Sequence, residues 1–143
     1  IPSVLEVKNG YWSREKFQGF QLFGKTLGII GLGRLGKISA NIGSGFGMKV
    51  IANDIKKIKY NNVKMVSLRK LASSSDIISI HVHLNHSTEN LINKKFFSNM
   101  KRKAFIINTA RGKIINESDL LYALKNKIIA GAGLDVIDGE WLR

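Results

Sequence analysis

The chain has 143 residues and contains no cysteine. This length suits a single domain, and a composition that is 44% hydrophobic is ordinary for a globular fold. The lack of cysteine excludes disulfides and thiolate metal sites, and it suits a cytoplasmic protein, which is what we expect. No apolar run approaches the roughly 18 residues of a membrane span, so we expect no membrane partner.

The formal net charge of +13 allows two interpretations. One is attraction to nucleic acid or to anionic ligands, and the other is a solvated surface in a lysine-rich composition. The lysines are spread along the chain, and aromatic side chains do not alternate with them as they do in a surface that stacks bases. We therefore expect no nucleic-acid partner, although the positive field can help to draw in anionic ligands.

The first 24 residues differ in character from the rest of the chain. Residues 1–10 suggest a short helix, and residues 11–24 are rich in aromatic side chains with charges between them. Two arrangements stay open: a second subunit covers this apolar segment, or the segment folds onto its own domain. Because the chain starts at Ile1 and stops at Arg143 inside an apparent motif, we expect it to be part of a longer polypeptide.

The stretch Thr26–Gly36, TLGIIGLGRLG, predicts a buried strand, a glycine turn and the start of a helix. The helix is indicated by apolar residues at helical spacing, namely Leu35, Ile38, Ile42 and Phe46. In this context Gly31 permits the tight turn, Gly33 lets a pyrophosphate approach the backbone, and Gly36 lets the helix pack closely on the strand. The amino terminus of the helix offers free N–H groups to the phosphates.

A second strand is expected at Met48–Ala52, and Asp54 follows its end. An acidic residue about 20 positions after the glycine turn accepts hydrogen bonds from the ribose hydroxyls of adenosine. It also repels a 2′-phosphate, so we expect NAD rather than NADP. The competing interpretation of Asp54 is an ordinary turn aspartate.

The remainder of the chain alternates between strands and helices. We expect strands within 60–66 and at 76–82, 104–108 and 130–134, and helices at 68–72, 93–100 and 117–126. This alternation implies a parallel sheet. The predicted fold class is α/β, a Rossmann-type doubly wound parallel sheet with helices on both faces, in which residues 1–143 form a dinucleotide-binding domain.

Residues that follow the strands are the candidates for function, because ligands of such sheets lie outside the carboxyl ends of the strands. Arg111 follows the strand at 104–108, and a guanidinium there can bind a carboxylate or a keto oxygen. A surface ion pair is the alternative for Arg111. Asp135, Asp138 and Glu140 follow the last strand, where a carboxylate can bind a nicotinamide amide or keep a histidine protonated.

Three histidines, His81, His83 and His86, cluster after the strand at 76–82. This clustering raises the possibility of a metal site. No cysteine or acidic cluster nearby completes a ligand set, so we expect histidines that line a pocket or a loop, and no metal.

These motifs, in this order, resemble the D-isomer-specific 2-hydroxyacid dehydrogenases over most of the chain. The motifs that carry the resemblance are Gly24–Gly36 with Trp12, Arg14 and Phe17 before it, Ser75–Val82 with Thr88, Leu91 and Ile92 after it, Asn108–Gly112, and Gly133–Val136 with Glu140. It implies NAD as the cofactor, a small 2-hydroxy or 2-keto acid as the substrate, and hydride transfer between them. It also implies a homodimer through the cofactor domain, with residues 1–24 in the contact, and a separate substrate domain outside this chain.

The same resemblance implies roles for individual residues. Arg111 binds and polarises the keto acid, and Glu140 pairs with a catalytic histidine that lies beyond this chain. Asp54 holds the adenosine ribose, and Asp135 holds the nicotinamide amide. The cofactor-binding residues expected in this way are Gly31, Gly33, Arg34, Leu35, Gly36, Asp54, His81, Val82, His83, Thr109, Ala110 and Asp135. A non-catalytic NAD-dependent corepressor or sensor with the same fold is the alternative function.

Overall fold

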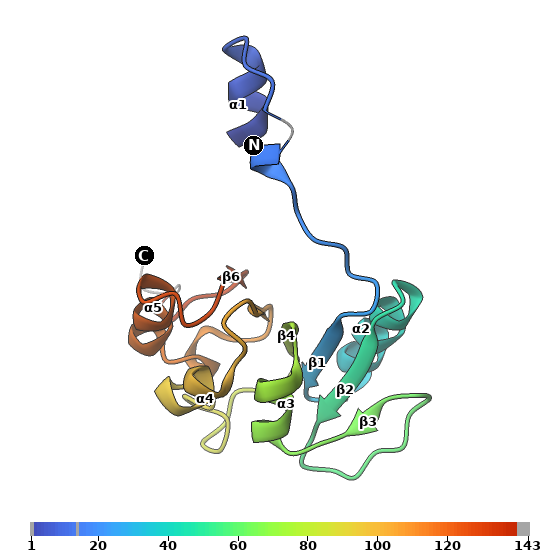
Figure 1. The fold of residues 1–143 in the computed structure, drawn as a ribbon. Helices are drawn as coiled ribbons and strands as arrows, with labels where there is room; N and C mark the ends of the chain where they lie inside the picture. The colour runs from blue at the N-terminus through green and yellow to red at the C-terminus, as the bar shows by residue number, and fades with distance from the viewer. Residues whose placement is uncertain (1, 14, 140–143) are drawn as a thin grey trace.

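The computed structural model describes residues 2–13 and 15–139, which form one six-stranded sheet with flanking helices (Figure 1). The strand order is β3-β2-β1-β4-β5-β6, and every pair of neighbours is parallel. The strands are β1 Thr26–Ile30, β2 Lys49–Asn53, β3 Lys64–Met65, β4 Ile77–Ile80, β5 Phe105–Asn108 and β6 Gly131–Leu134. The helices are α1 Pro2–Lys8, α2 Arg34–Gly45, α3 Leu68–Ser74, α4 Lys94–Asn99 and α5 Glu117–Lys125, with short 3-10 helices η1 Glu15–Phe17 and η2 Gly112–Ile114. This order confirms the predicted Rossmann-type fold.

The predicted strands all occur, with shifted ends. β2 lies slightly later than Met48–Ala52, and β4 is shorter than the predicted 76–82. β3 is an edge strand that pairs only Lys64 and Met65 with β2, which is why the range 60–66 contains so little regular structure.

Two apolar cores lie on opposite faces of the sheet. One packs the sheet against α3, α4 and α5, with Ile30, Ile80 and Phe97 among its buried members. The other lies beneath α2 and includes Leu27 and Ile29. Figure 1 shows α2 and α3 on opposite sides of β1 and β2. Because neighbouring residues of β1 belong to different cores, this strand is buried on both faces, as its apolar sequence predicts.

Helix α2 lies on the sheet through its small residues rather than through its apolar stripe. The buried residues of the helix are Gly36, Ala40 and Gly43, and a Cβ on Gly43 would press into the Leu27 side chain. The apolar residues that indicated the helix are exposed instead, with fractions of 60% for Leu35, 50% for Ile38, 56% for Ile42 and 58% for Phe46. The spacing therefore predicted the helix correctly, while the side that packs is set by the close approach of glycine and alanine.

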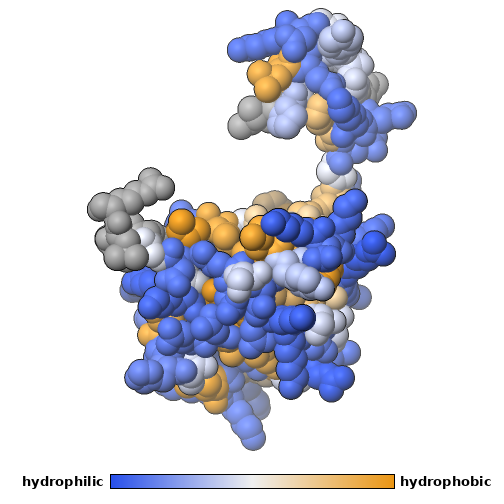
Figure 2. Space-filling model, turned by 90° about the vertical axis from the view of Figure 1, so that its left-hand side faces the viewer, coloured by the Kyte–Doolittle hydropathy of each residue, from blue (hydrophilic) through white to orange (hydrophobic). Residues whose placement is uncertain are grey.

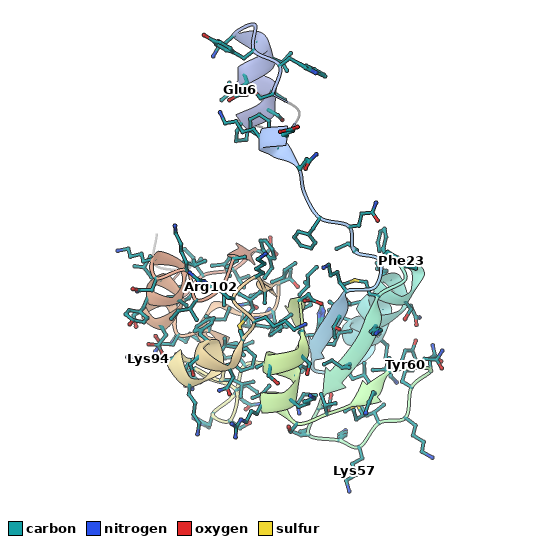
Figure 3. All side chains as sticks on the ribbon, viewed as in Figure 1. Glu6, Phe23, Lys57, Tyr60, Lys94 and Arg102 are labelled. Atoms are coloured by element: carbon teal, nitrogen blue, oxygen red, sulfur yellow. The ribbon has the colours of Figure 1, made fainter. Side chains whose placement is uncertain are left out.

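The segment before β1 forms an arm, with α1 and η1 standing away from the sheet (Figure 1). Its apolar side chains are largely solvent-exposed, including Trp12 at 76%. Where the arm joins the sheet, the Phe20 and Phe105 rings stack at 5.5 Å, and the Phe23 side chain lies at Gly47 (Figure 3). Hydrophobic residues gather on the side of the sheet domain nearest the arm (Figure 2).

No helix in the described part of the chain is long and apolar enough to cross a membrane.

Candidate functional site

In the turn between β1 and α2, two of the three motif glycines, Gly31 and Gly36, have no room for a side chain. Gly31 has a φ of +92°, and its N–H donates to the Asn53 carbonyl of β2 at 2.8 Å. A Cβ on Gly31 would lie 2.8 Å from the His81 carbonyl oxygen and from Val82 Cγ1. A Cβ on Gly36 would overlap the carbonyl oxygen of Gly31. The turn is therefore packed tightly between the ends of β2 and β4, mainly against backbone atoms.

The middle glycine of the motif faces open space. Gly33 is the N-cap of α2, and no heavy atom of the described residues lies within 4 Å of the position its Cβ would take, leaving out its neighbours in the chain. No side chain of the described residues caps this end of the helix. Arg34 and Leu35 follow in the first turn and are exposed. An open, uncapped helix N-terminus with its partial positive charge fits a pyrophosphate.

Asp54 lies directly beside this turn. Its Oδ2 accepts a hydrogen bond from the Leu32 N–H at 2.7 Å, and its Oδ1 accepts one from the Lys56 N–H at 2.9 Å. The two bonds fix the carboxylate at the end of β2, next to the glycine turn. An acidic group at this place, one strand away from a phosphate-binding turn, is where a ribose would present its hydroxyls.

The end of β4 supplies the wall on the other side of the turn. His81 is half-buried, and its Nε2 lies 2.9 Å from Ser79 Oγ. Burial lowers the pKa of His81, which favours the neutral ring. Val82 is half-buried, whereas His83 is exposed and accepts a hydrogen bond on its carbonyl from Thr88 Oγ1 at 2.6 Å. In the described part of the chain, no three metal-ligating side chains gather in a group that could hold a metal ion.

The loop after β5 carries Thr109, Ala110 and Arg111. Arg111 is exposed, and its Nη1 donates to the Ala110 carbonyl at 2.6 Å. The loop is anchored by Asn108, whose side chain accepts from the Ala110 N–H at 3.0 Å and donates to the Arg111 carbonyl at 2.9 Å. The guanidinium is thus carried on a short, ordered loop at the carboxyl edge of the sheet.

The loop after β6 packs against the Arg111 loop. The Asp135 N–H donates to the Asn108 carbonyl at 3.0 Å, and a Cβ on Gly112 would collide with the backbone of Ile137 and Asp138. The Asp138 N–H donates to Glu117 Oε1 at 2.6 Å. Asp135 is therefore held close to the start of the Arg111 loop. Glu140 lies outside the described residues.

The predicted residues after β1, β2, β4, β5 and β6 all lie at one edge of the sheet, because the strands are parallel. From β1 the strand order runs through β2 to β3 on one side and through β4 to β6 on the other. The point between β1 and β4, where the order reverses, is the topological switch point at which such sheets bind ligands. Sequence reasoning did not single out the side chains of Asn108 and Glu117. A buried asparagine at the end of an apolar strand, directly before a functional loop, is the signal that would have found the first.

The fold and this edge together define a dinucleotide-binding domain. Residues 3–143 match the family described as D-isomer specific 2-hydroxyacid dehydrogenase, NAD binding domain, and the chain belongs to this family. The domain is therefore an NAD-binding domain, and a Rossmann fold with an open helix N-terminus fits that cofactor.

Individual relatives agree with the assignment. The chain is 40% identical over 133 residues to a glyoxylate reductase of Korarchaeum cryptofilum, covering 90% of this chain and 40% of that protein. A crystal structure of D-lactate dehydrogenase with NAD+ from Lactobacillus jensenii shares 34% identity with a TM-score of 0.85, covering 98% of this chain and 43% of the other. An acyclic imino acid reductase in complex with NADPH and D-Arg shares 34% identity with a TM-score of 0.92, over 99% of this chain and 47% of the other. The chain thus spans less than half the length of these relatives.

Proposed function

We propose that the protein is an oxidoreductase that transfers a hydride between NAD and a small 2-hydroxy or 2-keto acid, and that residues 1–143 are its NAD-binding domain. A separate substrate domain would complete the protein. The observation that carries this proposal is the placement of Arg111, an exposed cation on an ordered loop, beside the loop that holds Asp135. A guanidinium at the nicotinamide end of a dinucleotide crevice suits a carboxylate substrate.

The cofactor would lie across the crevice from Asp54 to Asp135. Asp54 would accept the ribose hydroxyls, and the N–H groups of Gly33, Arg34 and Leu35 would bind the pyrophosphate. His81, Val82 and His83 would line the adenine side, and Thr109 and Ala110 would line the nicotinamide side together with Asp135. When bound, NAD supplies the hydride acceptor or donor.

Arg111 would hold the substrate by its carboxylate and polarise the 2-keto oxygen through charge-assisted hydrogen bonds. Fixing the carboxylate would place the reacting carbon toward the cofactor and lower the entropy cost of reaction. Reduction of the ketone also needs a proton, which we assign to a histidine outside this chain. Glu140, beyond the described residues, would pair with that histidine and raise its pKa so that it donates the proton.

The test is turnover of 2-keto acids by the full-length protein. We expect NADH oxidation with at least one of glyoxylate, pyruvate and hydroxypyruvate, and we expect Arg111→Ala to reduce kcat/KM by about 100-fold or more, in line with the loss of a charge-assisted contact to a reacting group. Arg69→Ala, an exposed arginine on α3, is the matched control and should leave kcat/KM unchanged. NADH binding without turnover of any 2-keto acid would instead support the corepressor or sensor.

We propose further that the protein is a homodimer formed through this domain. The support is an exposed apolar stripe formed by Leu35, Ile38 and Ile42 of α2 and by Phe46 at the end of the helix, together with the exposed apolar side chains in the described part of the arm. Ile38→Asp with Ile42→Asp should give monomers in analytical ultracentrifugation. Leu121→Asp, an equally exposed leucine on α5, should remain dimeric. A wild-type protein that sediments as a monomer would contradict the proposal.

We also propose that the protein works in the cytoplasm, because its cysteine-free composition suits a reducing compartment and its cofactor is NAD. Fractionation of cells that express the tagged full-length protein tests this proposal. Recovery with a cytoplasmic marker is expected, and recovery with a membrane or secreted fraction would contradict it.

A further inference from the structure

Asn108 is a polar side chain in an apolar place. It is the last residue of β5, it is 1% exposed, and its strand neighbour Ile106 is fully buried. Among the described residues, Asn108 and Ser75 are the buried side chains that carry polar groups. A buried amide is costly unless both its oxygen and its nitrogen find partners, so the residue needs a structural or functional reason to be there.

Besides its strand pairing in the sheet, Asn108 makes hydrogen bonds to the loops that carry Arg111 and Asp135. Its side-chain oxygen accepts from the Ala110 N–H at 3.0 Å, and its side-chain nitrogen donates to the Arg111 carbonyl at 2.9 Å. Its main-chain oxygen accepts from the Asp135 N–H at 3.0 Å. One residue thus fixes the backbone on both sides of Ala110 and ties it to the neighbouring loop.

Two further contacts hold the same pair of loops together. Gly112 lets the backbone at Ile137 and Asp138 approach where any side chain would collide. Glu117, at the start of α5, accepts a hydrogen bond from the Asp138 N–H at 2.6 Å. The Arg111 loop is therefore fixed at its start by the Asn108 amide and at its end by backbone packing.

We propose that Asn108 is a positioning residue that aims the Arg111 guanidinium at the substrate carboxylate. The inference rests on the proposed function, because it acts through Arg111. The amide is needed because it both accepts and donates. An aspartate would keep the acceptor for the Ala110 N–H but would set a carboxylate oxygen against the Arg111 carbonyl, so the loop would lose its second bond.

The experiment compares Asn108→Asp with Asn93→Asp in the full-length protein, with glyoxylate, pyruvate and hydroxypyruvate as probes. Asn93 is a matched control, since its side chain also accepts from backbone N–H groups, of Lys95 and Phe96, and donates to a backbone carbonyl, that of Asn90. We expect Asn108→Asp to raise KM for the 2-keto acid about tenfold or more while the Kd for NADH stays within about twofold. Asn93→Asp should change neither constant.

Two variants make the test specific. In an Arg111→Ala background, Asn108→Asp should lower kcat/KM no further, because its effect passes through Arg111. Asn108→Ser keeps a small hydroxyl that can both accept and donate, so it should fold and show a smaller rise in KM.

A change in KM no larger than that of Asn93→Asp would overturn the inference, and so would an equal rise in KM and in the Kd for NADH. A further loss in the Arg111→Ala background would overturn it as well. If Arg111→Ala itself leaves KM and kcat normal, the substrate role in the proposed function fails, and this result is distinct from a failure confined to Asn108→Asp.

Discussion

The two ends of the proposed cofactor crevice are held together in different ways. At the adenosine end, Gly31 and Gly36 bring backbone directly against backbone, and a single carboxylate, Asp54, lies against the turn. At the nicotinamide end, the loops after β5 and β6 are held by side-chain hydrogen bonds from Asn108 and Glu117. The first end is held mainly by close backbone contacts at two glycines, whereas the second combines one such contact, at Gly112, with the side-chain hydrogen bonds.

This difference has consequences for mutation. Adding a methyl group at the adenosine end should distort the turn, because backbone cannot yield as a flexible side chain does. Removing a hydrogen bond at the nicotinamide end should loosen a loop while the sheet stays intact.

The largest effect is expected for Gly36→Ala, whose Cβ would overlap the Gly31 carbonyl oxygen. Overpacking of this kind should lower the free energy of unfolding by about 3 kcal/mol. Urea denaturation followed by far-UV circular dichroism measures this change. Gly33→Ala is the control, because its Cβ meets open space, and it should change stability by less than about 0.5 kcal/mol. Equal losses in the two variants would contradict the backbone-packed turn.

The next effect concerns Asp54, which should matter for binding more than for folding. Asp54→Asn removes the negative charge that accepts ribose hydroxyls, so the Kd for NADH should rise about tenfold. The preference for NADH over NADPH should also narrow, because the repulsion of a 2′-phosphate is lost. Calorimetric titration with NADH and with NADPH measures the two Kd values. An unchanged ratio of the two Kd values would show that the carboxylate is not at the ribose.

A smaller effect is expected at the opposite edge of the sheet, at Asp76. Burial, the largest single influence, raises its pKa, but the Thr26 N–H and the Lys101 ammonium at 2.9 Å outweigh burial and leave the pKa below its ordinary value. The folded protein thus binds this proton less readily than the unfolded chain does. The stabilisation is present above the unfolded pKa of about 3.9 and is lost as the pH falls through the lower folded value.

Asp76→Asn should therefore cost about 1 kcal/mol at pH 7 and should flatten the loss of stability below about pH 4. Its Kd for NADH should stay normal, since the residue lies at the far end of β4. Urea midpoints from pH 2.5 to pH 7 measure the first effect. A variant that loses stability with acid as steeply as the wild type would contradict the role of this carboxylate.

The smallest effect is expected for His81, whose pKa is lowered by burial. Here the folded state disfavours the proton, so its contribution to stability is present above the unfolded pKa of about 6.5 and is lost as the pH falls through the lower folded value. Between pH 7 and pH 8 the histidine should contribute no change. His81→Phe should remove a small decline in the thermal unfolding midpoint that the wild type shows as the pH falls below about 6.5. A decline of the same size in the variant would show that a group other than His81 causes the loss of stability.

The contrast between the two ends also explains what could be predicted from the sequence. The glycine turn and the position of Asp54 could be predicted, because the spacing of Gly31, Gly33, Gly36 and Asp54 along the chain is itself the signal. The anchoring by Asn108 joins it to Ala110 and Arg111, which are close in the chain, but the sequence alone does not show that the amide is buried and bonded in this way. The contact made by Glu117 depends on which loops lie next to each other after folding. Residues that are distant along the chain, such as Glu117 and Asp138, give no local signal for such a contact.

Helix α2 shows a second feature that the sequence alone does not predict, namely which face of the helix packs on the sheet. Its apolar spacing predicted a helix, and the structure has one at Arg34–Gly45. Periodicity alone would place the stripe of Leu35, Ile38, Ile42 and Phe46 toward a core, but Gly36, Ala40 and Gly43 allow a closer approach and take that side. A helix with one small face and one apolar face can bury either, and only the tertiary structure decides between them.

The most direct test of the account is a crystal structure of the full-length protein with NAD bound. We predict that the pyrophosphate lies over the N–H groups of Gly33, Arg34 and Leu35, with the adenosine ribose at Asp54 and the nicotinamide between Asp135 and the Arg111 loop. A cofactor that binds away from the β1–α2 turn, or with its ribose hydroxyls remote from Asp54, would contradict the account.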